Sequence, residues 1–188
     1  MKKTIKTLSG VVLIVMGFGL IVALAFPSLS DSAHAGRSEK KIPLEFSFLK
    51  EEHAPLVLIY FGYVGCTRVC TPALSDLAQI YRLRKIASAD HLPALWFVNM
   101  TPRMDSASVQ SWAEHFDSDF KSYAPSESEL QTISQTLNLV YTNLGVKAEH
   151  MPYAYLAKKT DIGYELVYIY TSSPYNRTVM LQDMEALQ

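Results

Sequence analysis

The sequence predicts an α/β domain built around a parallel pair of strands. Residues 55–63 and 94–100 are apolar nearly throughout and rich in β-branched and aromatic side chains, which is the composition of central strands covered on both faces. Between them, residues 73–87 carry apolar side chains at helical spacing. Strand, helix and strand in this order make a βαβ unit with a right-handed crossover.

An apolar segment at the N-terminus precedes this domain. Leu8–Pro27 contains no charged residue, and lysines stand on its N-terminal side, as they do in export signals. Two interpretations stay open: a signal peptide with a cleavage pattern at Ala33-x-Ala35, or a membrane-spanning anchor. Both place the lysines in the cytoplasm and the remaining chain on the exported side. The lysines are Lys2, Lys3 and Lys6.

The predicted chain therefore has three parts. Residues 1–27 form the anchor or signal segment, residues 28–41 are small and polar and form a flexible tether, and residues 42–188 form the folded domain. A length of 188 residues suits one such domain with its own core. The formal net charge of -1 gives no electrostatic reason to expect nucleic acid as a partner.

Shorter patterns predict the remaining strands and helices of the domain. One segment alternates apolar and polar residues, two have an apolar face at helical spacing, and two near the C-terminus read as strands joined by a turn. Asp105 or Ser106 is the expected N-cap of the helix predicted at 105–116. The segments are a strand at 42–49, helices at 105–116 and 126–139, and antiparallel strands at 153–159 and 164–171.

Both cysteines of the chain, Cys66 and Cys70, lie where the strand at 55–63 passes into the helix at 73–87. On the exported side a disulfide is the simplest interpretation of the pair. Such a bridge would close a loop of only three intervening residues, so its contribution to stability would be among the smallest a disulfide can make. The pair is therefore expected to be labile or functional.

The position of the two cysteines also favours ionised thiols. Free N–H groups and the dipole at a helix start stabilise a thiolate, and the charge of Arg68 acts in the same direction. A pair of thiolates is a soft ligand that selects Cu(I), and a nearby imidazole would extend the range to Cu(II). Structural zinc normally requires four protein ligands, and the two cysteines do not supply them.

A histidine that could complete a metal site is not identified by the residues alone. His150 differs from the others because it lies in a loop just before the strand at 153–159, next to Met151 and Pro152. Even so, a histidine in a polar connection is more often a solvated surface residue than a ligand. The other four are His34, His53, His91 and His115, in the tether, in polar connections or on the outer side of a helix.

Three ordered stretches of the chain resemble the signature regions of the Sco/SenC family. They are LIYFGYVGCTRVCTPALSDL, WFVNMTPRMDSASVQSWAEHF and YTNLGVKAEHMPYAYLAKKTDIG, and the resemblance extends from about residue 42 to residue 172. The family consists of membrane-tethered, thioredoxin-like copper proteins that help to assemble the dinuclear copper site of cytochrome c oxidase.

The resemblance implies a thioredoxin-like fold, with a central mixed β-sheet flanked by helices, that follows an N-terminal transmembrane or signal helix. It also implies one copper ion, Cu(I) or Cu(II), held by Cys66, Cys70 and His150. The implied partner is the copper-site subunit of cytochrome c oxidase or another copper or thiol protein, met on the exported side of the membrane.

The chain departs from the family pattern beside each of these residues. The family usually has Pro-Asp-Val between the cysteines and proline after the second, whereas this chain has Thr67-Arg68-Val69 and then Thr71. Thr101 replaces the aspartate of an Asp-Pro pair, and Glu149 replaces the aspartate before the histidine. A cation at position 68 should weaken Cu(II) more than Cu(I), because the divalent ion feels the local field more strongly.

Three hypotheses for function follow. The first is a membrane-tethered copper metallochaperone that uses Cys66, Cys70 and His150. The second is a thiol–disulfide oxidoreductase in which Cys66 and Cys70 are catalytic and His150 accepts a proton, with a peroxidase that passes through a sulfenic acid as a variant. The third is an exported interaction module with a weak disulfide and no chemistry.

Overall fold

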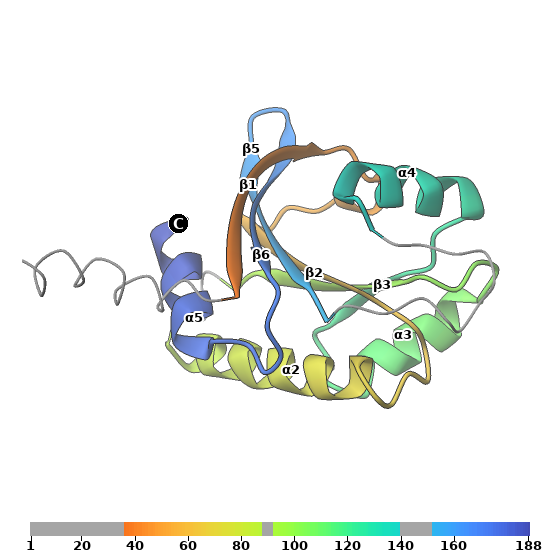
Figure 1. Ribbon diagram of the computed structural model, residues 1–188, viewed down its shortest axis with the longest axis horizontal. Helices are drawn as coiled ribbons and strands as arrows, with labels where there is room; N and C mark the ends of the chain where they lie inside the picture. Colours follow the sequence, from red (N-terminus) through yellow and green to blue (C-terminus); the bar gives the residue numbers. More distant parts are fainter. Residues whose placement is uncertain (1–35, 88–91, 140–151) are drawn as a thin grey trace, which may run out of the picture. The chain divides into compact units, whose positions relative to one another are not determined.

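The computed structural model describes residues 36–87, 92–139 and 152–188, which form one mixed β-sheet with helices on both faces. Helices α2, α3 and α5 cover one face, and α4 with a short 3-10 turn covers the other (Figure 1). The predicted α/β, thioredoxin-like arrangement of a central sheet flanked by helices is confirmed for this part of the chain. Within the same part, no helix is long and apolar enough to cross a bilayer.

The sheet has six strands in the order β1-β6-β5-β2-β3-β4. Strand β2 runs parallel to β3, and β3 runs parallel to β4, as the predicted βαβ unit requires. The other neighbouring strands are antiparallel. The strands are β1 Arg37–Leu44, β2 Leu56–Gly62, β3 Ala94–Asn99, β4 Lys121–Tyr123, β5 Ala154–Thr160 and β6 Gly163–Tyr170.

Three of the described helices begin after a residue whose side chain accepts a hydrogen bond from a free main-chain N–H group. Asp105 is the N-cap of α3, as predicted, and its side chain accepts a hydrogen bond from the Ser108 N–H at 2.8 Å. Ser126 and Glu129 form a capping box at the start of α4. The helices are α2 Cys70–Ala87, α3 Ser106–Glu114, α4 Glu127–Leu137 and α5 Arg177–Ala186, and the 3-10 turn η2 is Ser47–Leu49.

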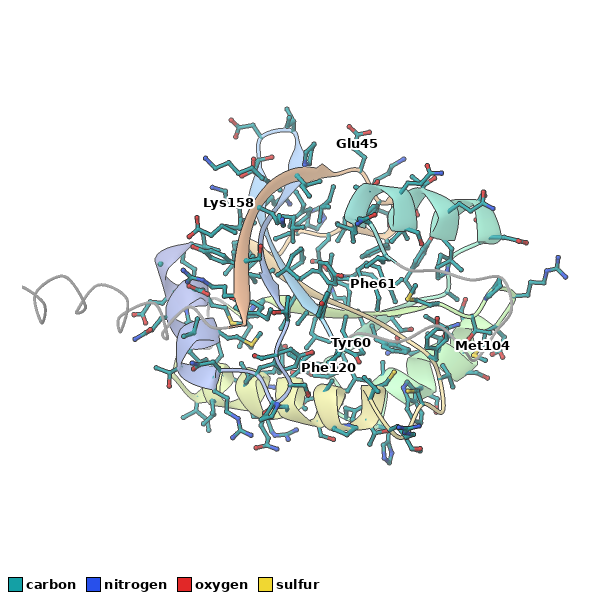
Figure 2. The ribbon with its side chains drawn as sticks, viewed as in Figure 1. Glu45, Tyr60, Phe61, Met104, Phe120 and Lys158 are labelled. Atoms are coloured by element: carbon teal, nitrogen blue, oxygen red, sulfur yellow. The ribbon has the colours of Figure 1, made fainter. Side chains whose placement is uncertain are left out.

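The central strand β2 is buried on both faces, because its side chains alternate between two apolar clusters. Leu58 and Tyr60 pack with α2, α3 and α5 on one side, while Ile59 and Phe61 pack with α4 and η2 on the other. Figure 2 shows Tyr60 and Phe61 on opposite sides of the strand. This burial explains the nearly continuous apolar run by which β2 was predicted.

Two boundaries differ from the prediction. Strand β1 begins at Arg37, so residues 37–41 of the predicted tether belong to the sheet. The reason is tertiary: Arg37 pairs in register with Tyr170 of β6, and its guanidinium forms an ion pair with Asp183 of α5. The strand expected at 42–49 ends at Leu44, and the apolar residues that follow turn into η2 to fill the core.

The predicted segment 1–27 and residues 28–35 of the tether lie outside the described residues. So does His150. Strand β4 and helix α5 were not predicted from the sequence, although both belong to the described fold.

Candidate metal centre

The two cysteines lie on the connection that leaves the carboxyl end of β2. Cys66 is in the loop, and Cys70 is the first residue of α2. The loop is fixed by its own main chain: the Cys66 N–H donates to the Tyr63 carbonyl at 3.1 Å. The carbonyl of Cys66 accepts hydrogen bonds from the Thr71 N–H at 3.1 Å and the Thr71 hydroxyl at 3.0 Å. This threonine, which stands where the family usually has proline, therefore closes the turn.

Both cysteines are free thiols, and they lie close together. The Cys70 N–H donates to the Cys66 sulfur at 3.4 Å, which is the contact of a sulfur at a helix start. Cys66 is partly exposed, whereas Cys70 is fully buried in the cluster beneath β2. One sulfur therefore faces the solvent and the other lies behind it.

Hydrogen bonds to its sulfur favour the ionised form of Cys66. Partial burial raises the pKa of this thiol, but hydrogen bonds from the Cys70 thiol and from the N–H groups of Cys70, Val69 and Arg68 outweigh it. The net effect holds the pKa of Cys66 below its ordinary value. Arg68 thus stabilises the thiolate through its main chain.

The environment of Cys70 has the opposite effect. Burial is the main cause that raises the pKa of Cys70 to about 12, and hydrogen bonds from Tyr63 and Tyr60 offset only part of it. The neighbouring Cys66 raises it further, because two adjacent thiolates repel each other. Without a metal the pair therefore carries its first negative charge on Cys66 and keeps a proton on Cys70.

Asn99, at the end of β3, connects the cysteine loop to the next loop of the chain. Its side chain is fully buried; the carbonyl oxygen accepts from the Val64 N–H at 3.4 Å, and the amide donates to the Thr101 carbonyl at 2.8 Å. Sequence reasoning missed this residue. The available signal was one amide inside an otherwise apolar strand, because a buried amide requires partners.

Gly62, the last residue of β2, leaves room for Cys70. A Cβ atom at this position would lie 2.9 Å from the rings of Phe97 and Tyr60 and 3.2 Å from the Cys70 sulfur. Gly65 in the loop adopts a φ of +80°, the left-handed region that glycine tolerates best. The two glycines allow the main chain to pass over the buried sulfur and turn into α2.

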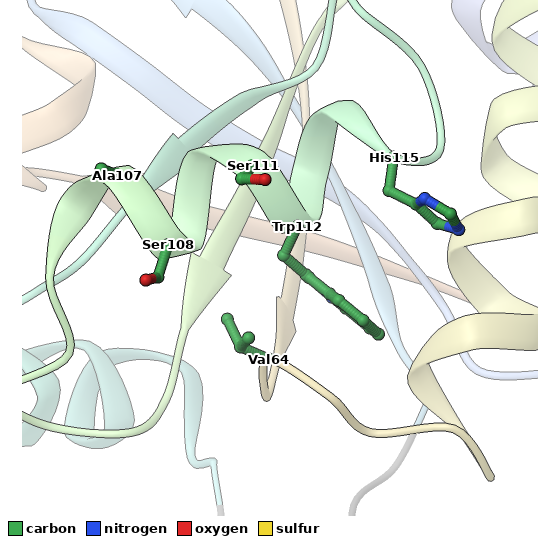
Figure 3. Close-up of a pocket in the computed structure, with 6 residues that line it drawn as sticks. All are labelled: Val64, Ala107, Ser108, Ser111, Trp112 and His115. Carbon is green, nitrogen blue, oxygen red and sulfur yellow. The ribbon is translucent and has the colours of Figure 1, made fainter.

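A shallow groove of about 510 Å³ lies beside the cysteine loop, between Val64 and the exposed side of α3 (Figure 3). Trp112 and His115 stack in this groove with ring centroids 6.5 Å apart. His115 is exposed, as the sequence predicted. The other lining residues are Ala107, Ser108 and Ser111.

The two described members of the predicted ligand set fit a soft metal ion. Cys66 and Cys70 provide two sulfur donors from one turn, which suits Cu(I). Among residues 36–87, 92–139 and 152–188, no three histidine, cysteine or acidic side chains cluster as a metal site would require. The predicted ligand His150 lies outside these ranges.

A mixed sheet with a cysteine pair at the turn from β2 to α2 defines a thioredoxin-like thiol or metal protein. Residues 50–186 match the SCO1/SenC family, and this match spans well over half of the chain. The chain belongs to the SCO1/SenC family.

Individual relatives are distant. An SCO2-like protein of Rickettsia conorii is 23% identical over 90 residues, which are 47% of this chain and 43% of that protein. The chain thus matches less than half the length of this curated relative. The structure of Arabidopsis thaliana ScoI with copper bound is 15% identical with a TM-score of 0.61, covering 79% of this chain and 96% of that one. A structure of BsSco, described as having a disulfide switch and as a member of the Sco family of cytochrome c oxidase assembly proteins, is 12% identical with a TM-score of 0.55, covering 80% and 91%.

Proposed function

We propose that this protein is a membrane-tethered copper metallochaperone that holds one copper ion through Cys66, Cys70 and His150. The copper is its cargo, delivered on the exported side of the membrane for assembly of the copper site of cytochrome c oxidase. The observation that carries the proposal is the pair of free thiols at the start of α2, with the Cys70 N–H 3.4 Å from the Cys66 sulfur.

Membership in the SCO1/SenC family supports this proposal. Within the fold shared with this chain, ScoI of Arabidopsis binds copper, and BsSco belongs to a family of cytochrome c oxidase assembly proteins. The donor chemistry agrees, because two sulfurs suit Cu(I) and an added imidazole stabilises Cu(II).

The residue between the two cysteines should bias the site towards the monovalent ion. Arg68 is exposed on the loop, where the family usually has an acid. A fixed positive charge beside the sulfurs repels Cu(II) more strongly than Cu(I). We therefore expect tight Cu(I) binding and weaker Cu(II) binding than an aspartate at this position would give, and Arg68→Asp is the variant that reverses the bias.

The test is copper stoichiometry and affinity of the reduced full-length chain in detergent. We expect one Cu(I) per chain, which the Cys66→Ala/Cys70→Ala variant loses. His150→Ala should keep most Cu(I) affinity and lose most Cu(II) affinity, while the matched control His115→Ala should change neither. Unchanged copper binding without either cysteine would refute the proposal, and equal losses of the two ions in His150→Ala would remove His150 from the ligand set.

A second function is favoured by the asymmetry of the two thiols. An accessible thiolate in front of a buried, protonated thiol is the arrangement that thiol–disulfide exchange uses. The Cys66 thiolate would attack a partner disulfide and release one partner thiolate. Cys70 would then lose its proton and attack Cys66, which leaves a Cys66–Cys70 disulfide and a fully reduced partner. Reduction of insulin by the reduced chain, with no specific copper uptake, would establish this function instead.

A further inference from the structure

We propose that Thr71 is a positioning residue for the two thiols: through its hydroxyl and its main-chain N–H it holds Cys66 in place beside Cys70 before copper binds. The inference rests on the proposed function, because it concerns the two sulfur ligands of that site. It is carried by hydrogen bonds among described residues, which close the turn from Cys66 to Thr71.

Thr71 binds the carbonyl oxygen of Cys66 twice. Its main-chain N–H donates to this oxygen at 3.1 Å, and its side-chain hydroxyl donates to the same oxygen at 3.0 Å. The main-chain bond joins residues five apart, one more than in a regular α-helix, whereas the Ala73 N–H makes the regular bond to the Val69 carbonyl at 3.2 Å. The turn that holds both cysteines is therefore wider than a helical turn, and the hydroxyl adds a second bond where it closes.

The two cysteines differ in how they are fixed. Cys70 is fully buried in the apolar cluster beneath β2 and is the first residue of α2. Cys66 is only partly buried, so its position depends more on hydrogen bonds. Its N–H donates to the Tyr63 carbonyl at 3.1 Å, and its sulfur accepts from the Cys70 N–H at 3.4 Å. The bonds from Thr71 to its carbonyl complete this set and attach the exposed cysteine to the helix that carries the buried one.

The hydroxyl bond can be removed while the main chain stays the same. Valine at position 71 has the branched shape of threonine but no donor, whereas serine keeps the hydroxyl without the methyl group. Without this bond the turn is freer to open in the metal-free chain, and ordering it would then oppose copper binding. A site made by two sulfurs depends on this order, because both must reach the same ion. We therefore expect a chain without the hydroxyl to hold Cu(I) less tightly.

The experiment compares Thr71→Val with Thr71→Ser and Thr160→Val in the full-length reduced chain in detergent. Thr160 is a matched control, because it is also partly buried and its hydroxyl donates to a main-chain carbonyl, that of Gly163, at 3.1 Å. It ends β5 beside the start of β2, whereas the cysteine loop leaves the other end of β2.

Four quantities are measured on each chain. They are the Cu(I) affinity, the rate at which bound Cu(I) passes to an excess of the chelator bicinchoninate, the amide hydrogen exchange of residues 66–73 without metal, and urea unfolding without metal. The last of these separates a loss of stability from a loss of position at Cys66.

For Thr71→Val we expect Cu(I) affinity to fall about fivefold, the effect of one hydrogen bond of average strength, with a faster release of the metal. Amide exchange in residues 66–71 should be faster before any copper is added. Thr71→Ser should restore the affinity, the release rate and the exchange, because it keeps the donor. Thr160→Val should leave all three as in the parent chain, whatever its effect on urea unfolding.

Three results would overturn the inference. The first is parent-like Cu(I) affinity and release in Thr71→Val. The second is an equal loss in Thr71→Ser, which would show that the hydroxyl is not responsible. The third is an equal loss in Thr160→Val, which would show that the effect follows from lower stability of the fold and not from the position of Cys66.

Failure of the proposed function appears elsewhere in the same experiment. A parent chain that binds no Cu(I), or whose binding survives in the Cys66→Ala/Cys70→Ala variant, refutes the ligand assignment and this inference together. A parent chain with cysteine-dependent Cu(I) binding that Thr71→Val leaves intact refutes the inference alone.

Discussion

At the scale of single residues, the two cysteines have the same chemistry and opposite environments. Cys66 receives hydrogen bonds at a helix start and is partly exposed, whereas Cys70 is buried behind it with a pKa of about 12. Either proposed function uses this difference. A metal from solution, or a partner disulfide, would reach the partly exposed Cys66 before the buried Cys70, and Cys70 would have to lose its proton before its sulfur could act.

The asymmetry predicts very different rates of alkylation. In the reduced chain at pH 7.5, Cys66 should react with iodoacetamide at least about 100-fold faster than Cys70, because only the thiolate reacts and the Cys70 sulfur is both protonated and covered. Mass spectrometry of the single variants Cys66→Ser and Cys70→Ser gives the two rates separately. Denaturant is the control, since unfolding should make the rates converge. Similar rates in the folded state would contradict the arrangement of the two thiols described above.

Residue-level prediction succeeded where the signal is local. The cysteine pair and its place at a strand-to-helix turn could be predicted because spacing and helix-start chemistry depend on nearby residues, and the cap at Asp105 follows the same rule. The role of Asn99 could not be predicted, because its side chain bonds to Val64, which is far away in the chain. His150 as a ligand remains a prediction, made from the family resemblance.

At the scale of elements, the buried side chain of Glu52 connects the segment before β2 to strands β3 and β4 through hydrogen bonds. The side chain of Glu52 accepts hydrogen bonds from Trp96 of β3 and Lys121 of β4, both at 2.8 Å, and from the N–H groups of His53 and Ala54 at 2.8 Å and 3.0 Å. Burial raises the pKa of Glu52, but these four hydrogen bonds outweigh it and lower the pKa to about 2.

The acid dependence of stability follows from this shift. Because the folded pKa lies below the unfolded value of 4.5, the ionised form stabilises the fold fully above pH 4.5, and its contribution is lost as pH falls towards 2. We expect Glu52→Gln to lower the free energy of unfolding at pH 7 by about 1–3 kcal/mol and to flatten its decline between pH 4.5 and 2. Urea unfolding across this range measures both.

The matched control is Glu51→Gln, which removes the same charge from the exposed neighbouring residue. It should leave the slope of stability against pH close to that of the parent chain. Some slope will remain even in Glu52→Gln, because hydrogen bonds from Ser47 and Tyr123 also lower the pKa of Glu129 to about 2. A full parent slope in Glu52→Gln would show that Glu52 is not the group responsible.

Strands and helices could be predicted where their buried residues form a continuous or periodic apolar pattern in the sequence. Strands β2 and β3 and helix α2 have continuous or periodic apolar residues, so their type and order followed from composition. The first part of β1 and all of β4 are polar edge segments that become strands only by pairing with β6 and β3. Helix α5 was not predicted, although Met180 and Met184 are buried on one side of it. Many of its other residues are polar, and Asn176 was not recognised as its N-cap.

At the scale of the whole molecule, the proposed function requires a thiol domain that stays close to a membrane. The uncharged run Leu8–Pro27 has about the 20 residues that a helix needs to cross a bilayer. Between this run and the sheet lie residues 28–36, which can extend about 30 Å at roughly 3.4 Å per residue. An anchored domain would therefore stay close to the membrane surface. This confinement would raise its effective concentration for a membrane-bound protein that accepts copper.

This arrangement predicts that the N-terminal segment is retained. Expressed in a bacterial host, the full-length chain should remain in the membrane fraction after a carbonate wash, with an intact mass that includes residues 1–27. In spheroplasts, added protease should cleave the folded domain. The N-terminal lysines are expected to stay in the cytoplasm, which places the domain on the outer side of the membrane. Replacement of Lys2, Lys3 and Lys6 by glutamate is the control, and it should reduce this outward insertion. A soluble chain with the mass of residues 36–188 would instead show that the N-terminal segment is a cleaved signal peptide. The protein would then carry copper as a freely diffusing molecule.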